Sequence, residues 1–245
     1  MSTTIVKHSE YNVEQLVFTP LTNPKNKTLQ SILLPTYDGG RGPLIQLPEI
    51  CLDMYGIPSK CDFYKEDYQR LFLKLPLNIK NKETKELTEG FLKQLDDKLN
   101  STEFKENTLG GKKAKYTYQP IVRFPVLEDG TPDPNKHPYM KIKLLTDYPT
   151  NKIKTMIIEQ TDENSRFLKT DTDTITDFEK YFPLRTNLKC MIVPIKIWVH
   201  PTSTNKSTYG LAFKLIKVLV KLPLERALAK HADEHDLDFF NSDSE

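Results

Sequence analysis

The sequence predicts a β-dominated fold that carries one helical insertion and an acidic C-terminal tail. Apolar and polar residues alternate in segments 68–75 and 139–145, and residues 190–221 are rich in β-branched and aromatic side chains. Seventeen prolines are spread along the 245 residues and punctuate short strands and loops. Because 38% of the residues are hydrophobic, the chain has enough apolar side chains for a core, and we expect residues 1–232 to form a single domain.

The first clear strand covers residues 68–75. Leu71, Leu73 and Leu75 fall on one face of this segment. Arg70, Phe72 and Lys74 fall on the other face. The alternation predicts a half-buried strand with an open basic face.

A helix is predicted for residues 83–100, where the pattern changes from period two to a helical period. Leu87, Phe91, Leu95 and Leu99 recur every four residues, with Lys, Glu, Asp and Gln between them. Such spacing indicates an amphipathic helix that packs through its apolar face. Glycines at positions 110 and 111 end this excursion.

The densest basic and aromatic stretch follows directly. It consists of Lys112, Lys113, Lys115, Tyr116, Tyr118 and Arg123. The adjacent glycines predict that the first three lysines lie on an exposed loop.

A second alternating strand is predicted at residues 139–145. Lys141 and Lys143 lie opposite Met140, Ile142 and Leu144 in the alternation. We expect this strand to form a hairpin with residues 152–158.

Two long strands close the domain. In the first, one apolar face is predicted from Met191, Val193, Ile195, Ile197 and Val199. This arrangement leaves Lys196, Trp198 and His200 on the opposite face. Residues 209–221 form the second strand, and the linker 201–208 joins the pair into a hairpin.

The charge distribution is asymmetric. Residues 233–245 contain six acidic side chains and no Lys or Arg. Without these six residues, 27 acidic side chains remain against 35 Lys and Arg, so residues 1–232 carry a net charge of +8. A basic body with an acidic tail is typical of a polyanion-binding protein whose own tail competes for the binding site.

Two interpretations of this tail stay open. A disordered acidic tail can occupy a cationic groove until a nucleic acid displaces it, which frees its aromatic residues for a partner protein. The residues that would contact this partner are Asp236, Asp238, Phe239 and Phe240. Alternatively, the tail is a disordered, solubilising end.

The strands combine cations with aromatic rings, as single-stranded nucleic-acid binding requires. Arg70, Phe72 and Lys74 form one such group, and Lys196 and Trp198 form another. Base stacking and core packing are both open for Trp198 and Phe72, because aromatic residues serve either purpose.

Catalytic and metal-binding patterns are weak. None of the five histidines stands beside a Cys or a paired acid in a catalytic spacing. His231 and His235 are four residues apart, but no further ligand pattern accompanies them. We therefore expect a protein that is not an enzyme and needs no metal or other cofactor. Three cysteines without framework spacing, and no apolar run of membrane-spanning length, lead us to expect an intracellular protein without a membrane partner.

Several segments, taken in order, resemble a known family. They are residues 42–49 (GPLIQLPE), 70–77 (RLFLKLPL), 91–98 (FLKQLDDK), 137–143 (HPYMKIK), 190–198 (CMIVPIKIW) and 209–218 (YGLAFKLIKV). Together with the acidic tail, this order is similar to that of the single-stranded DNA-binding proteins of nucleocytoplasmic large DNA viruses. That family in turn resembles a phage replication type with an OB-fold and an acidic aromatic tail. The phage-type tails end on the aromatic residue, whereas residues 241–245 follow Phe240 here.

The resemblance implies an OB-fold-like barrel that binds single-stranded DNA without strict sequence preference in viral DNA replication, recombination or repair. Transferred by position, the DNA path includes Lys112, Lys113, Lys115, Tyr116, Lys141, Lys143, Lys196 and Trp198. The tail is then expected to bind a replication polymerase or helicase. The expected location is the host nucleus or a cytoplasmic viral replication site, or the virion if the protein is packaged. A homodimer is one of the oligomeric states that the sequence leaves open.

Two other functions are compatible with the sequence. The first is a virion structural or transcription-associated interaction protein whose basic faces are merely solvated. The second is an RNA-binding OB protein, because stacking platforms accept either sugar.

Overall fold

A computed structural model describes residues 4–20, 32–40, 42–109, 115–161, 165–169, 172–203 and 206–223 of the chain. Within these residues, twelve strands form one mixed sheet and helices are few. The predicted β-dominated class is therefore confirmed. The expected acidic tail, residues 233–245, lies outside the described residues.

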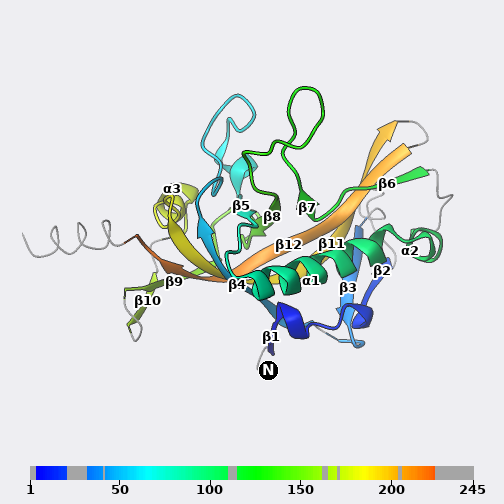
Figure 1. The fold of residues 1–245 in the computed structure, drawn as a ribbon, viewed down its shortest axis with the longest axis horizontal. Coiled ribbons are helices and arrows are strands. Elements are labelled where there is room, and N and C mark those ends of the chain that lie inside the picture. Colours follow the sequence, from blue (N-terminus) through cyan, green and yellow to red (C-terminus); the bar gives the residue numbers. More distant parts are fainter. Residues whose placement is uncertain are drawn as a thin grey trace, which may run out of the picture.

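The elements follow the order shown in Figure 1. The strands are β1 (Ile5–Lys7), β2 (Leu16–Pro20), β3 (Ile32–Tyr37), β4 (Leu44–Leu52), β5 (Phe72–Pro76), β6 (Tyr116–Tyr118), β7 (Val122–Arg123), β8 (Tyr139–Leu144), β9 (Met156–Gln160), β10 (Arg166–Lys169), β11 (Thr186–Ser203) and β12 (Lys206–Lys221). The α-helices are α1 (Lys82–Asn100), α2 (Thr102–Asn107) and α3 (Ile175–Glu179), and the 3-10 turns are η1 (His8–Glu10), η2 (Val13–Gln15) and η4 (Asp67–Arg70).

The antiparallel pair β11–β12 is the spine of the sheet and confirms that the two strands form a hairpin. The predicted linker 201–208 is wrong, because residues 201–203 belong to β11 and residues 206–208 belong to β12. On its side away from β12, β11 pairs with β4 and β3. On its side away from β11, β12 pairs with β6, β8 and β9, which all run parallel to it. The expected hairpin between residues 139–145 and 152–158 is wrong. Both β8 and β9 pair with β12 instead. The two segments are joined by an isolated bridge between Thr146 and Ile153 and by hydrogen bonds of Leu145 with Lys154 and Thr155.

A β-bulge in β11 changes which residues face the core. Leu188, Cys190 and Ile192 are buried, and Pro194 pairs with Phe213. The next pair is Lys196 with Ala212, so Ile195 is the extra residue of the bulge. Beyond the bulge the buried position is Ile197.

The expected apolar face of this strand is therefore wrong in its first half. Met191, Val193 and Ile195 are only partly buried, because even-numbered positions face the core before the bulge. Proline fits at this place, since a bulge tolerates a residue that cannot donate to the strand ladder. Lys196, Trp198 and His200 follow the bulge and lie on the outward face, as predicted.

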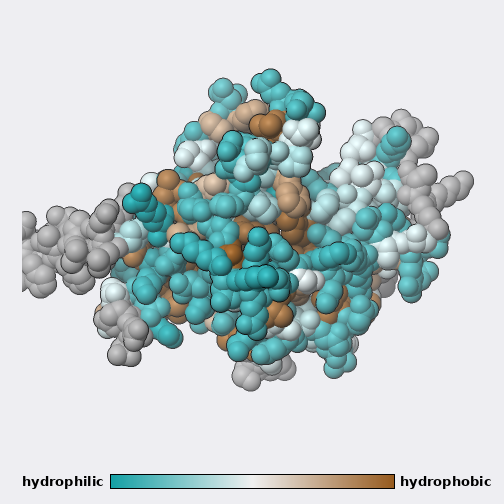
Figure 2. Space-filling model, viewed as in Figure 1, coloured by the Kyte–Doolittle hydropathy of each residue, from teal (hydrophilic) through white to brown (hydrophobic). Residues whose placement is uncertain are grey.

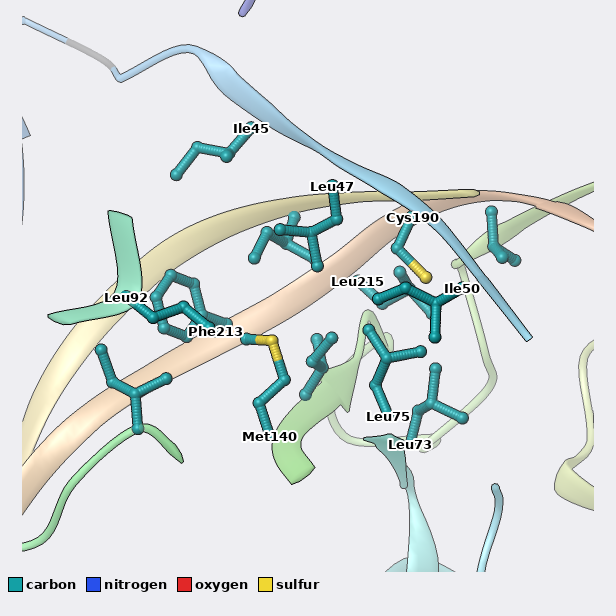
Figure 3. Packing of buried hydrophobic residues seen from close by; sticks show 14 of the residues in the cluster. Ile45, Leu47, Ile50, Leu73, Leu75, Leu92, Met140, Cys190, Phe213 and Leu215 are labelled. Atoms are coloured by element: carbon teal, nitrogen blue, oxygen red, sulfur yellow. The ribbon is translucent and has the colours of Figure 1, made fainter. Parts of the chain in front are cut away.

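The predicted helix is confirmed and begins one residue earlier than expected. Helix α1 crosses in front of the β11–β12 pair in Figure 1 and buries Phe91, Leu92, Leu95 and Leu99 in the core, where Phe91 packs on His8 and Tyr11. Leu87, expected on the packed face, is 48% exposed, and Thr88 is buried in its place. Figure 3 shows the core where β4, β5, β8, β11, β12 and α1 converge, and Figure 2 shows that the surface over α1 is mainly hydrophilic.

The OB-type closure is not confirmed. Among the described residues the ordered path of the sheet ends at β1 and β5, and no closed barrel forms. No helix in the described part of the chain is long and apolar enough to cross a membrane.

Candidate nucleic-acid interface

Five of the predicted nucleic-acid-binding residues line one hollow on the sheet, which we call the basic groove. Its lining comprises Gln119, Arg123, Lys141, Lys143, Lys196, Trp198, Val199, His200 and residues 211–213. No acidic residue is among them in the described part of the chain. Segments 119–123, β8, β11 and β12, which are far apart in sequence, therefore bring their cations to one place.

The groove lies on the face of the sheet that turns away from the core. Met140 and Ile142 are fully buried, whereas Lys141 and Lys143 occupy the alternate positions of β8. The alternation predicted for residues 139–145 is thus confirmed. Because α1 contributes to the core, the lysine face is the one that α1 leaves uncovered.

Lysines stand directly opposite each other on neighbouring strands. Lys74 of β5 pairs with Lys141 of β8, and Lys143 of β8 pairs with Lys214 of β12. None of these four side chains forms an ion pair with a described acidic residue. Like charges in facing positions destabilise a sheet, so this arrangement lowers stability while no anion is bound.

The crowding of positive charge changes the titration of two lysines. Loss of solvent, together with the nearby cations of Arg123, Lys143 and Lys74, lowers the pKa of Lys141 to about 8. Loss of solvent also lowers the pKa of Lys143, with Lys196 and Lys214 as further causes. An incoming phosphate would relieve both effects by favouring the charged ammonium.

Aromatic rings beneath these lysines partly compensate for the repulsion. The Nζ of Lys141 lies 3.6 Å from the centre of the Phe72 ring, and the Nζ of Lys74 lies 5.5 Å from that of Tyr139. A cation above a ring face is stabilised by the negative potential of that face. The rings therefore hold the lysines in place without neutralising them.

Trp198 lies on the groove side of the sheet rather than in the core. Its cross-strand partner is Gly210, and a Cβ added at Gly210 would lie only 2.7 Å from Cζ2 of the indole. The absence of a side chain there lets the indole lie close on β12. His200 lies beside it, with ring centres 5.1 Å apart. The side chain is partly buried, so its position is compatible with base stacking, and the role of Trp198 stays a prediction.

Arg70 is not part of the groove, contrary to the prediction. Its guanidinium is 3% exposed and forms ion pairs with Asp67, at 2.9 Å, and with Glu179. It also donates to the carbonyl of Pro58 at 3.2 Å. A buried cation needs such partners, and Arg70 therefore joins η4 to α3 instead of binding a phosphate.

Phe72 is buried as well, with 3% of its surface exposed. Its ring contacts Tyr64 edge-on and supports Lys141 from below. It cannot offer a face to a base in this position. The predicted open face of this strand therefore keeps only Lys74.

Tyr116 and Tyr118 do not line the groove. Both rings pack on the buried Tyr209, and the Tyr118 hydroxyl donates to Oδ1 of Asp96 at 2.6 Å. Burial and the Asp96 carboxylate raise the pKa of Tyr118 strongly. Lys115 remains exposed, with its Nζ 5.7 Å from the Tyr116 ring centre, and lies outside the groove lining.

Asp96 positions the segment that leads into the groove. The same Oδ1 accepts a hydrogen bond from the backbone N–H of Ile121 at 2.9 Å, and the Gln119 N–H donates to the carbonyl of Tyr209 at 2.8 Å. These bonds fix residues 118–121 between α1 and β12. Arg123 follows directly at the groove edge.

Six predicted site residues lie outside the described part of the chain. They are Lys112, Lys113, Asp236, Asp238, Phe239 and Phe240. Their predicted roles stay predictions.

Gln119 and His200 line the groove and Lys214 lines an adjoining hollow, although the prediction did not assign a role to any of the three. The sequence did not show which way Lys214 faces, because odd-numbered and even-numbered positions of β12 are both largely apolar. Its register against Lys143 reveals it. His200 shares its parity with Trp198, which is a signal that the sequence already contains.

In the described residues, no group of three or more His, Cys, Asp or Glu side chains is placed to hold a metal ion. No protein-family model matches the chain, and no curated protein matches it. The groove must therefore be interpreted from its own chemistry.

Substitution of Gly210 by Ala tests the position of Trp198. The added Cβ would lie 2.7 Å from Trp198 Cζ2 and 3.1 Å from the Gln119 carbonyl oxygen, so the indole must move. We expect a shift in the emission of the single tryptophan and a more accessible indole in quenching experiments. Gly90→Ala is the matched control, because nothing lies within 4 Å of a Cβ there. Identical emission in the wild type and Gly210→Ala would contradict the described packing.

The low pKa of Lys141 predicts how stability depends on pH. Because the folded value is about 8 and the ordinary value is 10.5, the unfolded chain binds more protons between these pH values. The free energy of unfolding should therefore rise with pH in this window, as repulsion in the groove is relieved. Lys141→Met should lose this rise and should be more stable than the wild type by about 1 kcal/mol at neutral pH. Urea unfolding of both proteins at neutral and alkaline pH measures the effect, and parallel curves would contradict it.

Proposed function

We propose that this chain binds single-stranded DNA, without strict sequence preference, in the basic groove. The observation that carries the proposal is two sets of facing lysines, Lys74 with Lys141 and Lys143 with Lys214. They lie beside the Trp198 indole on the face of the sheet that α1 leaves uncovered. Lysines at this density suit a phosphate backbone. An accessible aromatic ring suits an unstacked base, whose face is hidden in a duplex.

The resemblance described above supports DNA and a replication role. The OB-type architecture, the action in viral replication, recombination or repair, and the absence of enzymatic activity belong to this proposal. So do docking of a polymerase or helicase on the tail, homodimer formation and a location at viral replication sites or in the virion.

The acidic tail is proposed to compete with DNA for the groove. Strand β12 ends at Lys221, and Lys214 stands seven residues earlier, about 23 Å along the strand. Asp233 follows Lys221 by 12 residues, which span up to about 40 Å when extended. The chain is therefore long enough for its own acidic residues to reach the lysines.

The lysine pair Lys143 and Lys214 provides the first test. Replacing both by Gln should weaken binding of a labelled oligothymidylate roughly tenfold and reduce the salt dependence of log K by about 1.4, since each lost phosphate contact contributes about 0.7. The control replaces Lys82 and Lys93 on the outer face of α1, which changes the net charge equally. Fluorescence anisotropy over a salt series measures both quantities.

The comparison with a duplex of the same length decides the proposal. Tight binding of the single strand, with quenching of Trp198, supports it. Equal and weak binding to both DNAs, with Trp198 emission unchanged, would contradict it and favour a virion structural or transcription-associated interaction protein. Competition between matched DNA and RNA oligomers identifies the preferred sugar.

Removal of residues 233–245 tests the tail. The shortened chain should bind single-stranded DNA several-fold more tightly at low salt, and the difference should shrink as salt screens the competition. A full-length variant with Asn at Asp236 and Asp238 separates charge from chain length. If the full-length and shortened proteins bind with equal affinity at all salt concentrations, the competition is excluded while the binding proposal stands.

A further inference from the structure

A second hollow adjoins the basic groove and shares three lysines with it. Lys141, Lys143 and Lys196 line both hollows. The remaining lining includes Tyr68 and Phe72 at the β5 side, Thr146 and Asn151 from the loop after β8, and Lys214. We call this the Tyr68 hollow.

Tyr68 offers a ring on a fixed backbone. Its side chain is 61% exposed, although it belongs to η4, a turn that is tied down on both sides. Glu66 and Gln69 cap this turn through reciprocal hydrogen bonds. Arg70 at its end is held by its two ion pairs. A ring so placed loses little conformational entropy when a flat ligand stacks on it.

The other walls of the hollow supply charge and polar groups. Lys214, Lys143 and Phe72 are aligned across three neighbouring strands, which places two ammonium groups and a buried ring in one row. In the same lining, Thr146 and Asn151 contribute a hydroxyl and a carboxamide, which can both donate and accept hydrogen bonds. No acidic residue is among the described lining.

This combination differs from that of a simple phosphate site. Lysines alone would suffice for an anion, whereas a base needs a ring face and polar groups for its edge. The Tyr68 hollow has all three, and Trp198 provides the ring face in the basic groove. Three strand spacings, about 14 Å, separate β11 from β5, and Gly210 beside Trp198 lies four residues, about 13 Å, from Lys214 along β12. A single strand that crosses both offsets spans about 20 Å, which takes several nucleotides.

We propose that the Tyr68 hollow is a second nucleotide subsite for the same strand. One base stacks on Tyr68 with its edge towards Thr146 and Asn151, while the shared lysines bind the phosphates between this base and the one on Trp198. This inference rests on the proposed function. It deepens that function by defining a path across β11, β12, β8 and β5 rather than along one strand.

Tyr68→Ala tests the stacking role in the full-length chain. Loss of one stacked base should weaken binding of an oligothymidylate long enough to span both hollows by roughly tenfold. Tyr68→Phe keeps the ring and should retain wild-type affinity. Tyr148→Ala is the control for an exposed tyrosine, because Tyr148 is 92% exposed and lines neither hollow. Equal affinities for Tyr68→Ala, Tyr148→Ala and the wild type would overturn the inference.

Photo-crosslinking provides a second, independent readout. An oligothymidylate with 5-iodouracil at successive positions should crosslink to the peptide that contains Tyr68 and, several nucleotides away, to the peptide that contains Trp198. If the wild type prefers single strands and Trp198→Ala weakens binding, but no position crosslinks near Tyr68, the second subsite is wrong while the proposed function stands. If the wild type shows no single-strand preference at all, the proposed function fails first and this inference with it.

Discussion

The β-bulge at Ile195 is the constraint on which the candidate interface depends. Before it, even-numbered residues of β11 face the core, as the buried Cys190 and Ile192 show. Unbroken alternation would carry Lys196 and Trp198 into that core. The extra residue shifts the parity by one, so Ile197 is buried and the two functional side chains turn outward. Strands β4, β8 and β9 all pair with the β11–β12 spine, whose register shifts again between Met191 and Ile192.

The lysines in and beside the groove lower the stability of the free protein. Two opposed lysine pairs and a lysine with a pKa near 8 are unfavourable in the free protein. Helix α1 and the apolar core on the other face of the sheet supply the stability that tolerates them. A bound polyanion would reverse the sign of this electrostatic contribution, because each phosphate stabilises the cations that repel one another without it. The same side chains therefore weaken the fold and, on the proposed function, drive binding.

The sequence predicted what depends on local pattern and missed what depends on distant partners. The period of residues 83–100 and the alternation of residues 139–145 place α1 and the β8 lysines correctly. Arg70 was predicted outward because its ion-pair partner Glu179 stands 109 residues away and leaves no local signal. Tyr116 and Tyr118 looked like stacking residues, yet their contacts with Tyr209 and Asp96 hold them outside the groove lining. The bulge was hidden because residues 190–195 are apolar at both parities, apart from the proline that permits it.

On the proposed function, selectivity for single strands depends on Gly210, a residue that need not touch the ligand. Lysines contribute to binding of duplex and single strand alike, since both present phosphates. The discriminating free energy is that of stacking, about 1–3 kcal/mol per base, which a duplex cannot supply because its base faces are already occupied. Trp198 can offer its face at the floor of the groove because Gly210 leaves room beneath it. Any side chain at position 210 would displace the indole from its place on β12 and press on the Gln119 carbonyl, so preference for single strands should fall more than affinity for duplex.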